Sequence, residues 1–273
     1  MFQELQKLGI QTDVDLLLRL GGLIFARFMG ATQVIPFLGG PLIPGQIKTG
    51  IPLVITVFLY GVIAPGMDGA RVPAFGIFYF ALVVKELFVG FCLGHVVSIP
   101  FYAVEAAGSF MDTQRGTTFA QTIAPFLGGQ ASLLGNLYIL LFMTLFLGAG
   151  GSHMVIQAIG ESFRALPVLV TPHTITPDSA FVTEIIVLSG AVFGIGLKVA
   201  APVVVAMLVT DVTLGVVNRV APNVQVFWLG MPLKTLLGLV IVFFALGSLS
   251  RVFGGLTVDL LVAMKQTIRS IAG

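Results

Sequence analysis

Five ionisable side chains lie within stretches of sequence that are otherwise strongly apolar. They are Arg27, Lys85, Glu86, Lys198 and Asp211. A charged group costs about 2.5–3.5 kcal/mol at the centre of a bilayer, so such residues face protein, water or each other. Two kinds of chemistry fit this pattern. One is an ion-coupling site that relays protons, and the other is a set of buried charges that hold helices together in an assembly.

A second polar group occupies the middle of the chain. Its members follow one another at spacings of three and four residues: Glu105, Gly108, Asp112 and Arg115. In a helix they share one face, and Asp112 can pair with Arg115. This face is turned either toward a pore or toward a partner chain. The alternative is an ordinary solvated loop between two membrane spans.

After Gly116 the sequence changes to "TTFAQTIAPFLGG", with β-branched threonines, a proline and paired glycines. Such a composition predicts that the chain leaves the helix and folds back. Phe110, Met111 and Phe119 then lie on or beside a partly polar loop. Their bulk suits either the plugging of a narrow passage or plain packing.

A third polar stripe lies near the C-terminal end of a long apolar stretch. Asp211, Gly215 and Asn218 recur at helical spacing, with Arg219 beside them. Prolines at 222 and 232 predict two breaks in the following chain. The stripe is either the polar inner face of a hairpin joint or a capped helix end near the membrane surface.

Enzymatic and metal-dependent functions are not expected from this sequence. The three histidines, at positions 95, 153 and 173, are far apart and have no second histidine or cysteine at metal-ligand spacing. A phosphate-binding loop and a G-x-S-x-G nucleophile motif are both lacking. Cys92, the single cysteine, lies in an apolar run and is expected to pack in the core.

The composition places the chain in a membrane. Of its 273 residues, 57% are hydrophobic and only 10% are charged, with a mean hydropathy of +1.05. A soluble domain carries about 25% charged residues. The net charge of +2 is dispersed and gives no indication of nucleic-acid binding. The N-terminal residues lack the basic and short apolar regions of a cleavable signal peptide.

The apolar stretches that must position these residues are uneven. Residues 131–149 form the cleanest candidate span. The other apolar stretches are short or carry a charge or a proline, and a break is expected at Lys198 and Pro202; these stretches are 16–38, 51–65, 75–104, 185–209 and 236–249. Turn-rich breaks are expected at 36–46, 64–73 and 166–179. Two GxxxG pairs, Gly90/Gly94 and Gly190/Gly194, favour close approach of helices. We therefore predict an all-α integral membrane protein of about six to eight partly broken helices.

Two of the polar regions resemble the signature sequences of the FliR/SctT family, the export-gate proteins of bacterial type III secretion systems. These regions are "AVEAAGSFMDTQRGTTFAQTIAP" (103–125) and "GVVNRVAPNVQVFWLGMPLK" (215–234). The matching residues are Ala107, Gly108, Gly116, Ala120, Pro125, Asn218, Arg219, Ala221, Pro222, Phe227, Gly230 and Pro232. Ala124 departs from the pattern, because many members have an aspartate there. The "DTQRG" run resembles the injectisome branch more than the flagellar branch.

The resemblance implies a gate in the bacterial inner membrane, with part of the assembly raised toward the periplasm. One copy of this chain would join five SctR/FliP-like subunits and about four SctS/FliQ-like subunits, together with an SctU/FlhB-like switch protein. Unfolded exported proteins would pass through it, and lipid would surround it. Residues 1–199 would form an SctR-like portion and 200–273 an SctS-like hairpin. Buried charges would lie at subunit contacts or near the aqueous channel.

The resemblance also implies roles for individual residues. A plug loop, within 106–130, would include Gly108, Phe110, Met111, Asp112, Thr113, Gln114, Arg115, Gly116, Thr117, Phe119 and Pro125. Gly108 and Gly116 would act as hinges, and Asp112 with Arg115 would hold the closed loop. Hairpin and subunit contacts would be made by Asp211, Asn218, Arg219, Pro222, Phe227, Gly230 and Pro232. No catalytic residue, cofactor or metal is implied.

One alternative function remains open from the residues alone. A secondary transporter with a midplane site would use Lys85, Glu86, Lys198 and Asp211 to couple ions. Transporters of this size usually show paired halves, and the two GxxxG pairs are the only pairing visible here. A membrane scaffold without a channel is a third possibility.

Overall fold

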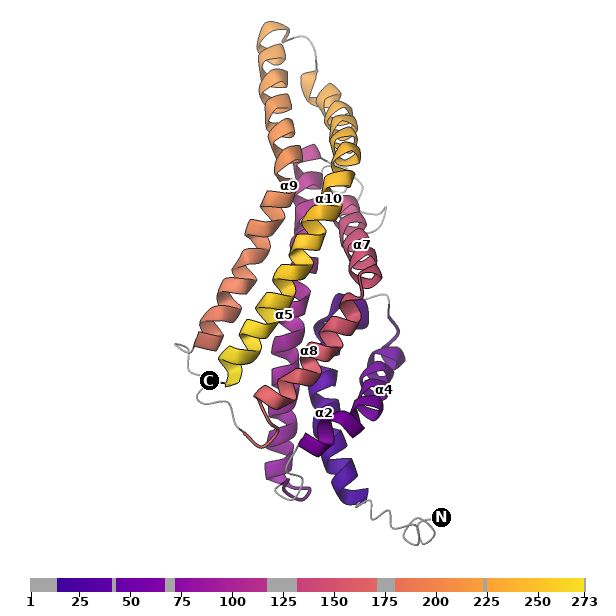
Figure 1. Ribbon diagram of the computed structural model, residues 1–273. Helices are drawn as coiled ribbons and strands as arrows, with labels where there is room; N and C mark the ends of the chain where they lie inside the picture. The colour runs from indigo at the N-terminus through magenta and orange to yellow at the C-terminus, as the bar shows by residue number, and fades with distance from the viewer. Residues whose placement is uncertain are drawn as a thin grey trace. The chain divides into compact units, whose positions relative to one another are not determined.

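A computed structural model describes residues 14–40, 43–66, 72–116, 132–170, 180–222 and 225–272 of the chain. Within these ranges the chain is helical and contains no strand, as predicted for an all-α membrane protein (Figure 1). The elements are α2 (Val14–Val34), α3 (Pro36–Gly39), α4 (Gly45–Ile63), the 3-10 helix η1 (Ala64–Gly66), α5 (Ile77–Arg115), α7 (Leu133–Gly148), α8 (Gly151–Ala165), α9 (Ala180–Val220) and α10 (Val226–Ala272).

The chain divides into two compact units. Unit 1 comprises Met1–Ser98, His153–Ile185 and Val262–Gly273, and unit 2 comprises Ile99–Ser152 and Ile186–Leu261. Three long helices, α5, α9 and α10, therefore contribute residues to both units. The boundary that the family resemblance suggests, between residues 199 and 200, falls inside the continuous helix α9. The division into an SctR-like and an SctS-like portion stays a prediction.

Unit 1 is built on the close packing of α2 against α5 and α4. A β-carbon added to Gly90 would collide with the backbone of Arg27, and one added to Gly94 would collide with Ala31. Gly30 of α2 is equally close to the backbone of Leu87. The Gly90/Gly94 pair thus brings two helices together as predicted.

A second part of the unit 1 core surrounds the single cysteine. Buried apolar side chains from α5, α9, α10 and the residue that follows α8 meet there: Val89, Cys92, Leu93, Leu166, Phe181 and Ile271. Cys92 is buried and has a free thiol, in agreement with the packing role predicted for it.

Unit 2 is organised around a buried aromatic cluster. The ring of Phe101 on α5 meets the rings of Phe142 and Phe146 on α7 edge-to-face, at centroid distances of 4.7 and 5.2 Å. Phe253 of α10 contacts Phe142 in the same geometry at 5.2 Å. Such pairs add about 0.5–1.5 kcal/mol each beyond the burial of their area. The cluster fixes α5, α7 and α10 of this unit against one another.

Within the described part of the chain, four helices are long and apolar enough to cross a membrane: α4, α5, α9 and the Trp228–Gly247 part of α10. The pair α7 and α8, bent by 73° at its break, provides a fifth candidate among the described residues. The chain is an all-α integral membrane protein.

Two predicted breaks are wrong, because Pro202 lies inside α9 and Pro232 lies inside α10. Neighbouring helices and local adjustments compensate the bond that a proline removes, and the bilayer interior offers no alternative to helical hydrogen bonding. Pro232 also lies close to the start of α10 at Val226, so its ring has only a short stretch of preceding helix to clash with.

Candidate functional site

The end of α5 and the start of α7 are joined by the carboxylate of Asp112. Its Oδ2 atom accepts hydrogen bonds from the Ser132 hydroxyl at 2.7 Å and from the Leu134 backbone N–H at 2.9 Å. Its Oδ1 atom accepts from Nη1 of Arg115 at 3.1 Å. We call Asp112, Arg115 and Ser132 the α5–α7 clamp.

Ser132 is also the N-cap of α7, because its hydroxyl oxygen accepts from the backbone N–H of Gly135 at 2.8 Å. The first N–H groups of a helix have no intrahelical acceptor, and negative charge is favoured beside them. Asp112 and Ser132 therefore satisfy two of these groups in α7. The clamp holds both flanks of the segment 117–131, which lies outside the described residues.

The structure corrects the extent of the predicted loop. Residues 108–115 belong to α5, and the chain leaves the helix only at Gly116, whose φ is +77°. Gly108 lies within this helix, and its Cα faces the backbone of Leu134 and Gly135 so closely that a β-carbon would collide with them. In this conformation Gly108 is a packing position of a continuous helix, and its role as a hinge stays a prediction.

The polar face of this helix is turned into the protein. Asp112 and Arg115 are both buried, and Met111 is buried beside them. Phe110 and Gln114 are half-buried, whereas Thr113 is exposed. The predicted Asp112–Arg115 pair is confirmed, but it faces α7 of the same unit and is not turned toward a solvated loop. Thr117, Phe119 and Pro125 lie outside the described residues.

The α9–α10 hairpin of unit 2 carries the second predicted group. Lys234 forms an ion pair with Asp211, and Gly230 lies opposite Leu214, so that the two helices run in opposite directions (Figure 1). A cavity of about 300 Å³ lies between them. It is lined by Arg115, Gly116, Asp211, Leu214, Gly215, Asn218, Val226, Gly230, Met231 and Lys234.

This arrangement confirms a hairpin with a polar inner face. Asp211, Gly215 and Asn218 all face the cavity, as their helical spacing predicts. α9 ends at Val220, just before Pro222. Arg219 is exposed, as are Pro222 and Pro232. Phe227 belongs to the first turn of α10.

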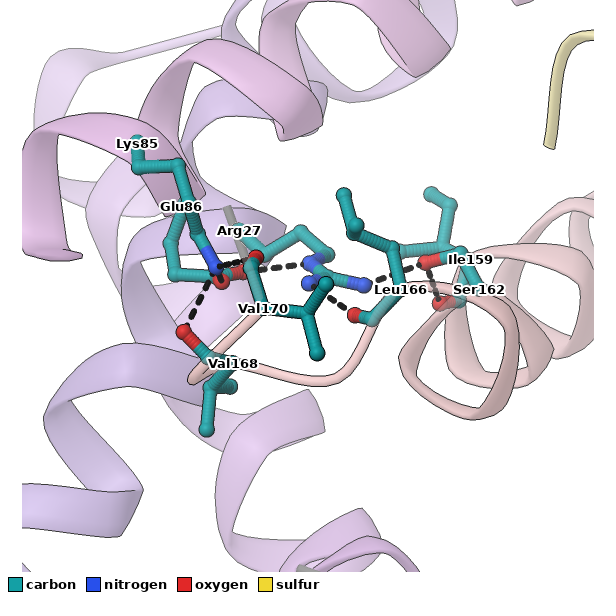
Figure 2. A network of polar contacts seen from close by, with 8 residues as sticks. All are labelled: Arg27, Lys85, Glu86, Ile159, Ser162, Leu166, Val168 and Val170. Atoms are coloured by element: carbon teal, nitrogen blue, oxygen red, sulfur yellow. Dashed lines mark hydrogen bonds and ion pairs between the residues drawn. The ribbon is translucent and has the colours of Figure 1, made fainter. Parts of the chain in front are cut away.

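The charges of α2 and α5 form a separate, largely buried network in unit 1 (Figure 2). Arg27 donates from Nε to Glu86 Oε2 at 2.5 Å and from Nη1 to the Ser162 hydroxyl at 2.9 Å. Its Nη2 donates to the carbonyl oxygen of Leu166 at 2.9 Å. The guanidinium carbon lies 3.8 Å from the ring centroid of Phe163, within the range of a cation–π interaction.

Lys85 completes the network from the other side of Glu86. Its ammonium lies 2.8 Å from Glu86 Oε1 and donates to the carbonyl oxygens of Val168 at 2.6 Å and Val170 at 3.1 Å. Two cations thus share one carboxylate, and the surplus positive charge is directed at backbone carbonyls just after α8. Figure 2 shows the charged groups of Arg27 and Lys85 beside Glu86, and the carbonyl oxygens of Val168 and Val170 beside the Lys85 ammonium.

This network bears on the expectation for the buried charges. Arg27 and Glu86 have side chains that are 0% exposed, and the partners described above all belong to unit 1. Unit 1 thus supplies the partners of these two charges, whereas a place at subunit contacts or near a channel stays a prediction for Lys198 and Asp211, which are exposed. Sequence reasoning missed Ser162 and the carbonyls of 166–170, because nothing in the residue types marks a backbone carbonyl as an acceptor.

The four residues of the alternative transport site are not gathered into one site by the described geometry. Lys198 and Asp211 belong to one helix and are separated by about 20 Å along it at 1.5 Å per residue. Lys85 and Glu86 belong to unit 1, where they pair with each other. Among the described residues, no group of three or more histidine, cysteine, aspartate or glutamate side chains could hold a metal ion.

Comparison with known proteins places these features in a family. Residues 18–260 match the family described as "Bacterial export proteins, family 1". The flagellar biosynthetic protein FliR of Bacillus subtilis (strain 168) is 31% identical over 215 residues, which is 78% of this chain and 80% of FliR. The surface presentation of antigens protein SpaR of Shigella flexneri is 30% identical over 220 residues, 81% of this chain and 82% of SpaR.

The Yop proteins translocation protein T of Yersinia pestis is similar to the same degree, with 29% identity over 216 residues, 78% of this chain and 80% of that protein. Flagellar and secretion-apparatus proteins therefore match almost equally well, and the assignment to the injectisome branch stays a prediction. The family match covers the clamp, the hairpin and the buried network together. The chain belongs to the bacterial export proteins of family 1, the FliR/SctT family.

Proposed function

We propose that this chain is a structural and gating subunit of a type III secretion export gate in the bacterial inner membrane. It forms part of the channel through which unfolded proteins leave the cytoplasm, and it is not an enzyme. Family membership supports the export role. The α5–α7 clamp, which fixes both flanks of the segment 117–131, is the structural observation that most favours gating.

The proposed assembly places one copy of this chain with five SctR/FliP-like and about four SctS/FliQ-like subunits, beside an SctU/FlhB-like switch protein. The surface of α4 supports a need for such neighbours or for lipid, because only 11% of its apolar stretch is buried within the chain. The α9–α10 hairpin likewise exposes large apolar side chains, among them Val212, Val216 and Trp228. Part of the assembly would be raised toward the periplasm.

In this proposal the segment from Gly116 to Pro125 plugs the channel, with Phe119 supplying bulk. Phe110 and Met111 belong to the helix that carries the plug, and Met111 packs inside the unit. The clamp fixes the end of α5 and the start of α7, the two helix ends that flank the plug.

Gly116 provides a test with a matched control. Gly116 and Gly150 are the two glycines with positive φ among the described residues, at +77° and +78°, and neither has an atom within 4 Å of the position that a β-carbon would occupy. Replacement by valine strains each backbone similarly, by about 1–2 kcal/mol. Gly116→Val should block secretion in a cell-based export assay, whereas Gly150→Val should reduce it far less.

A second variant tests whether the segment closes the channel to small solutes. Shortening the segment 117–131 should let small solutes leak across the inner membrane. If Gly116→Val and the shortened chain both secrete and seal like the wild type, the plug assignment is wrong.

The assembly itself is tested by native mass after membrane extraction, with and without co-expressed SctR-like and SctS-like neighbours. A complex with one copy of this chain among several of each partner supports the proposal. A stable monomer or homodimer that ignores both partners contradicts it.

The exposed Arg219 offers a narrower test of subunit contact. Because its side chain makes no ion pair among the described residues, Arg219→Glu should leave the fold of the subunit unchanged. We expect it to weaken assembly with the partners. An intact complex carrying this charge reversal removes Arg219 from the subunit interface.

A further inference from the structure

We propose that Gly238 of α10 is a positioning residue for the α5–α7 clamp: its missing side chain makes the space that Arg115 needs to reach Asp112. Only the connection between this contact and the sealing of the channel rests on the proposed function. The contact between Gly238 and Arg115 stands on the geometry of unit 2 alone.

The two residues meet without a gap. A β-carbon on Gly238 would lie 2.6 Å from Cδ, 2.9 Å from Cγ and 2.9 Å from Nε of Arg115. Carbon atoms in ordinary contact are about 3.5–4.0 Å apart. The middle of the Arg115 side chain therefore runs directly across the bare surface of α10 at this position.

The rest of Arg115 shows that it has little freedom to move elsewhere. The side chain is 2% exposed, and its Nη1 donates a hydrogen bond to Asp112. Its Nε is buried and has no acceptor among the described residues. A guanidinium has five N–H donors, and leaving a buried donor unpaired is costly. The Arg115 side chain keeps this conformation only because the surrounding residues hold it, and Gly238 is one of these residues.

Through Asp112, Arg115 in turn affects both the end of α5 and the start of α7. Asp112 binds Arg115 with one oxygen and caps α7 through Ser132 and Leu134 with the other. Displacement of Arg115 removes the positive charge that balances this carboxylate in a buried site. The α9–α10 hairpin thus supports the clamp through this contact, and a shift of α10 at Gly238 would loosen the flanks of 117–131.

Gly238→Ala tests the contact, with Gly247→Ala as the matched control in the same helix. Gly247 is exposed and has nothing within 4 Å of a β-carbon position, so alanine there changes only helix propensity. In the purified export complex, we expect Gly238→Ala to lower the thermal midpoint by about 2 °C or more. Gly247→Ala should leave the midpoint unchanged or raise it.

The second half of the experiment repeats both changes in an Arg115→Ala background. Without the long side chain, alanine at position 238 meets no obstacle, so its effect should shrink to that of Gly247→Ala. Solute leak across the inner membrane and secretion are measured on the same set of variants. We expect Gly238→Ala to raise the leak only while Arg115 is present.

The outcomes are separable. If Gly238→Ala behaves like Gly247→Ala, or destabilises the complex equally with and without Arg115, the positioning role is overturned. If the midpoints show the coupling while leak and secretion stay at wild-type values, the contact is supported and the sealing role of the clamp fails. Coupling in both measurements supports the whole inference.

Discussion

Glu86 is the residue whose loss should be felt most strongly, because two cations share its carboxylate. Its side chain and that of Arg27 are 0% exposed, and that of Lys85 is 12% exposed. The charged atoms are 2.5 and 2.8 Å apart in the two pairs. Glu86→Gln keeps the shape of the side chain and removes the charge, so two cations remain buried beside each other with only neutral acceptors.

The expected cost follows from this burial. Removing one partner of a buried ion pair costs about 3–5 kcal/mol, because the other charge is left uncompensated. At roughly 2–4 °C per kcal/mol for a chain of this size, the thermal midpoint should fall by roughly 6–20 °C. Asp15→Asn is the control, because Asp15 is 54% exposed in its pair with Arg19 on helix α2. An exposed pair contributes at most about 1 kcal/mol.

The assay is thermal unfolding of the detergent-extracted protein, followed by circular dichroism, on a double-mutant cycle. Adding Arg27→Met to Glu86→Gln removes one of the two uncompensated cations, so the double variant should be more stable than the sum of the single effects predicts. A midpoint for Glu86→Gln within the range of Asp15→Asn would refute the reasoning. Strict additivity of the two substitutions would refute it as well.

Three further predictions use the same measurement. Gly90→Ala overpacks the contact with α2 and should cost about 1–3 kcal/mol, whereas Gly190→Ala, in open space, should gain up to about 1 kcal/mol. Equal effects at the two sites would contradict the packing role of Gly90. Asp112→Asn loses charge-assisted bonds and should cost about 1.5–3 kcal/mol, against at most about 0.5 kcal/mol for the exposed Thr113→Ala. Lys234→Met should cost at most about 1 kcal/mol, because its carboxylate partner is 44% exposed, and a larger loss would indicate a buried role.

The sequence predicts the features that depend on short-range rules. Hydropathy and charge content predict the membrane class. Helical spacing predicts that Asp112 can pair with Arg115 and that Asp211, Gly215 and Asn218 share one helix face, although it leaves open what these faces meet. The change of composition after Gly116 correctly marks the point where the helix ends. These features follow from the 3.6-residue period and from local backbone sterics, both of which are visible in neighbouring residues.

The same rules fail where helix continuity depends on surroundings. Pro202 and Pro232 predict breaks, yet α9 and α10 run through them. The plug loop implied by the family resemblance includes residues 108–115, yet these residues are helical and pack against α7. At the two prolines, tertiary contacts and the lack of water as a hydrogen-bond partner outweigh the local preference of proline.

Partner identity is decided by the tertiary structure alone. Gly90/Gly94 and Gly190/Gly194 are the same motif, but the first pair touches α2 and the second has nothing within 4 Å. Arg27 finds its acceptors at Ser162, 135 residues along the chain, and at a backbone carbonyl. A sequence determines which face of a helix is buried, because the spacing of apolar and polar residues along a helix is a local property. Which surface meets that face depends on how distant segments pack, and no pattern within one helix encodes it.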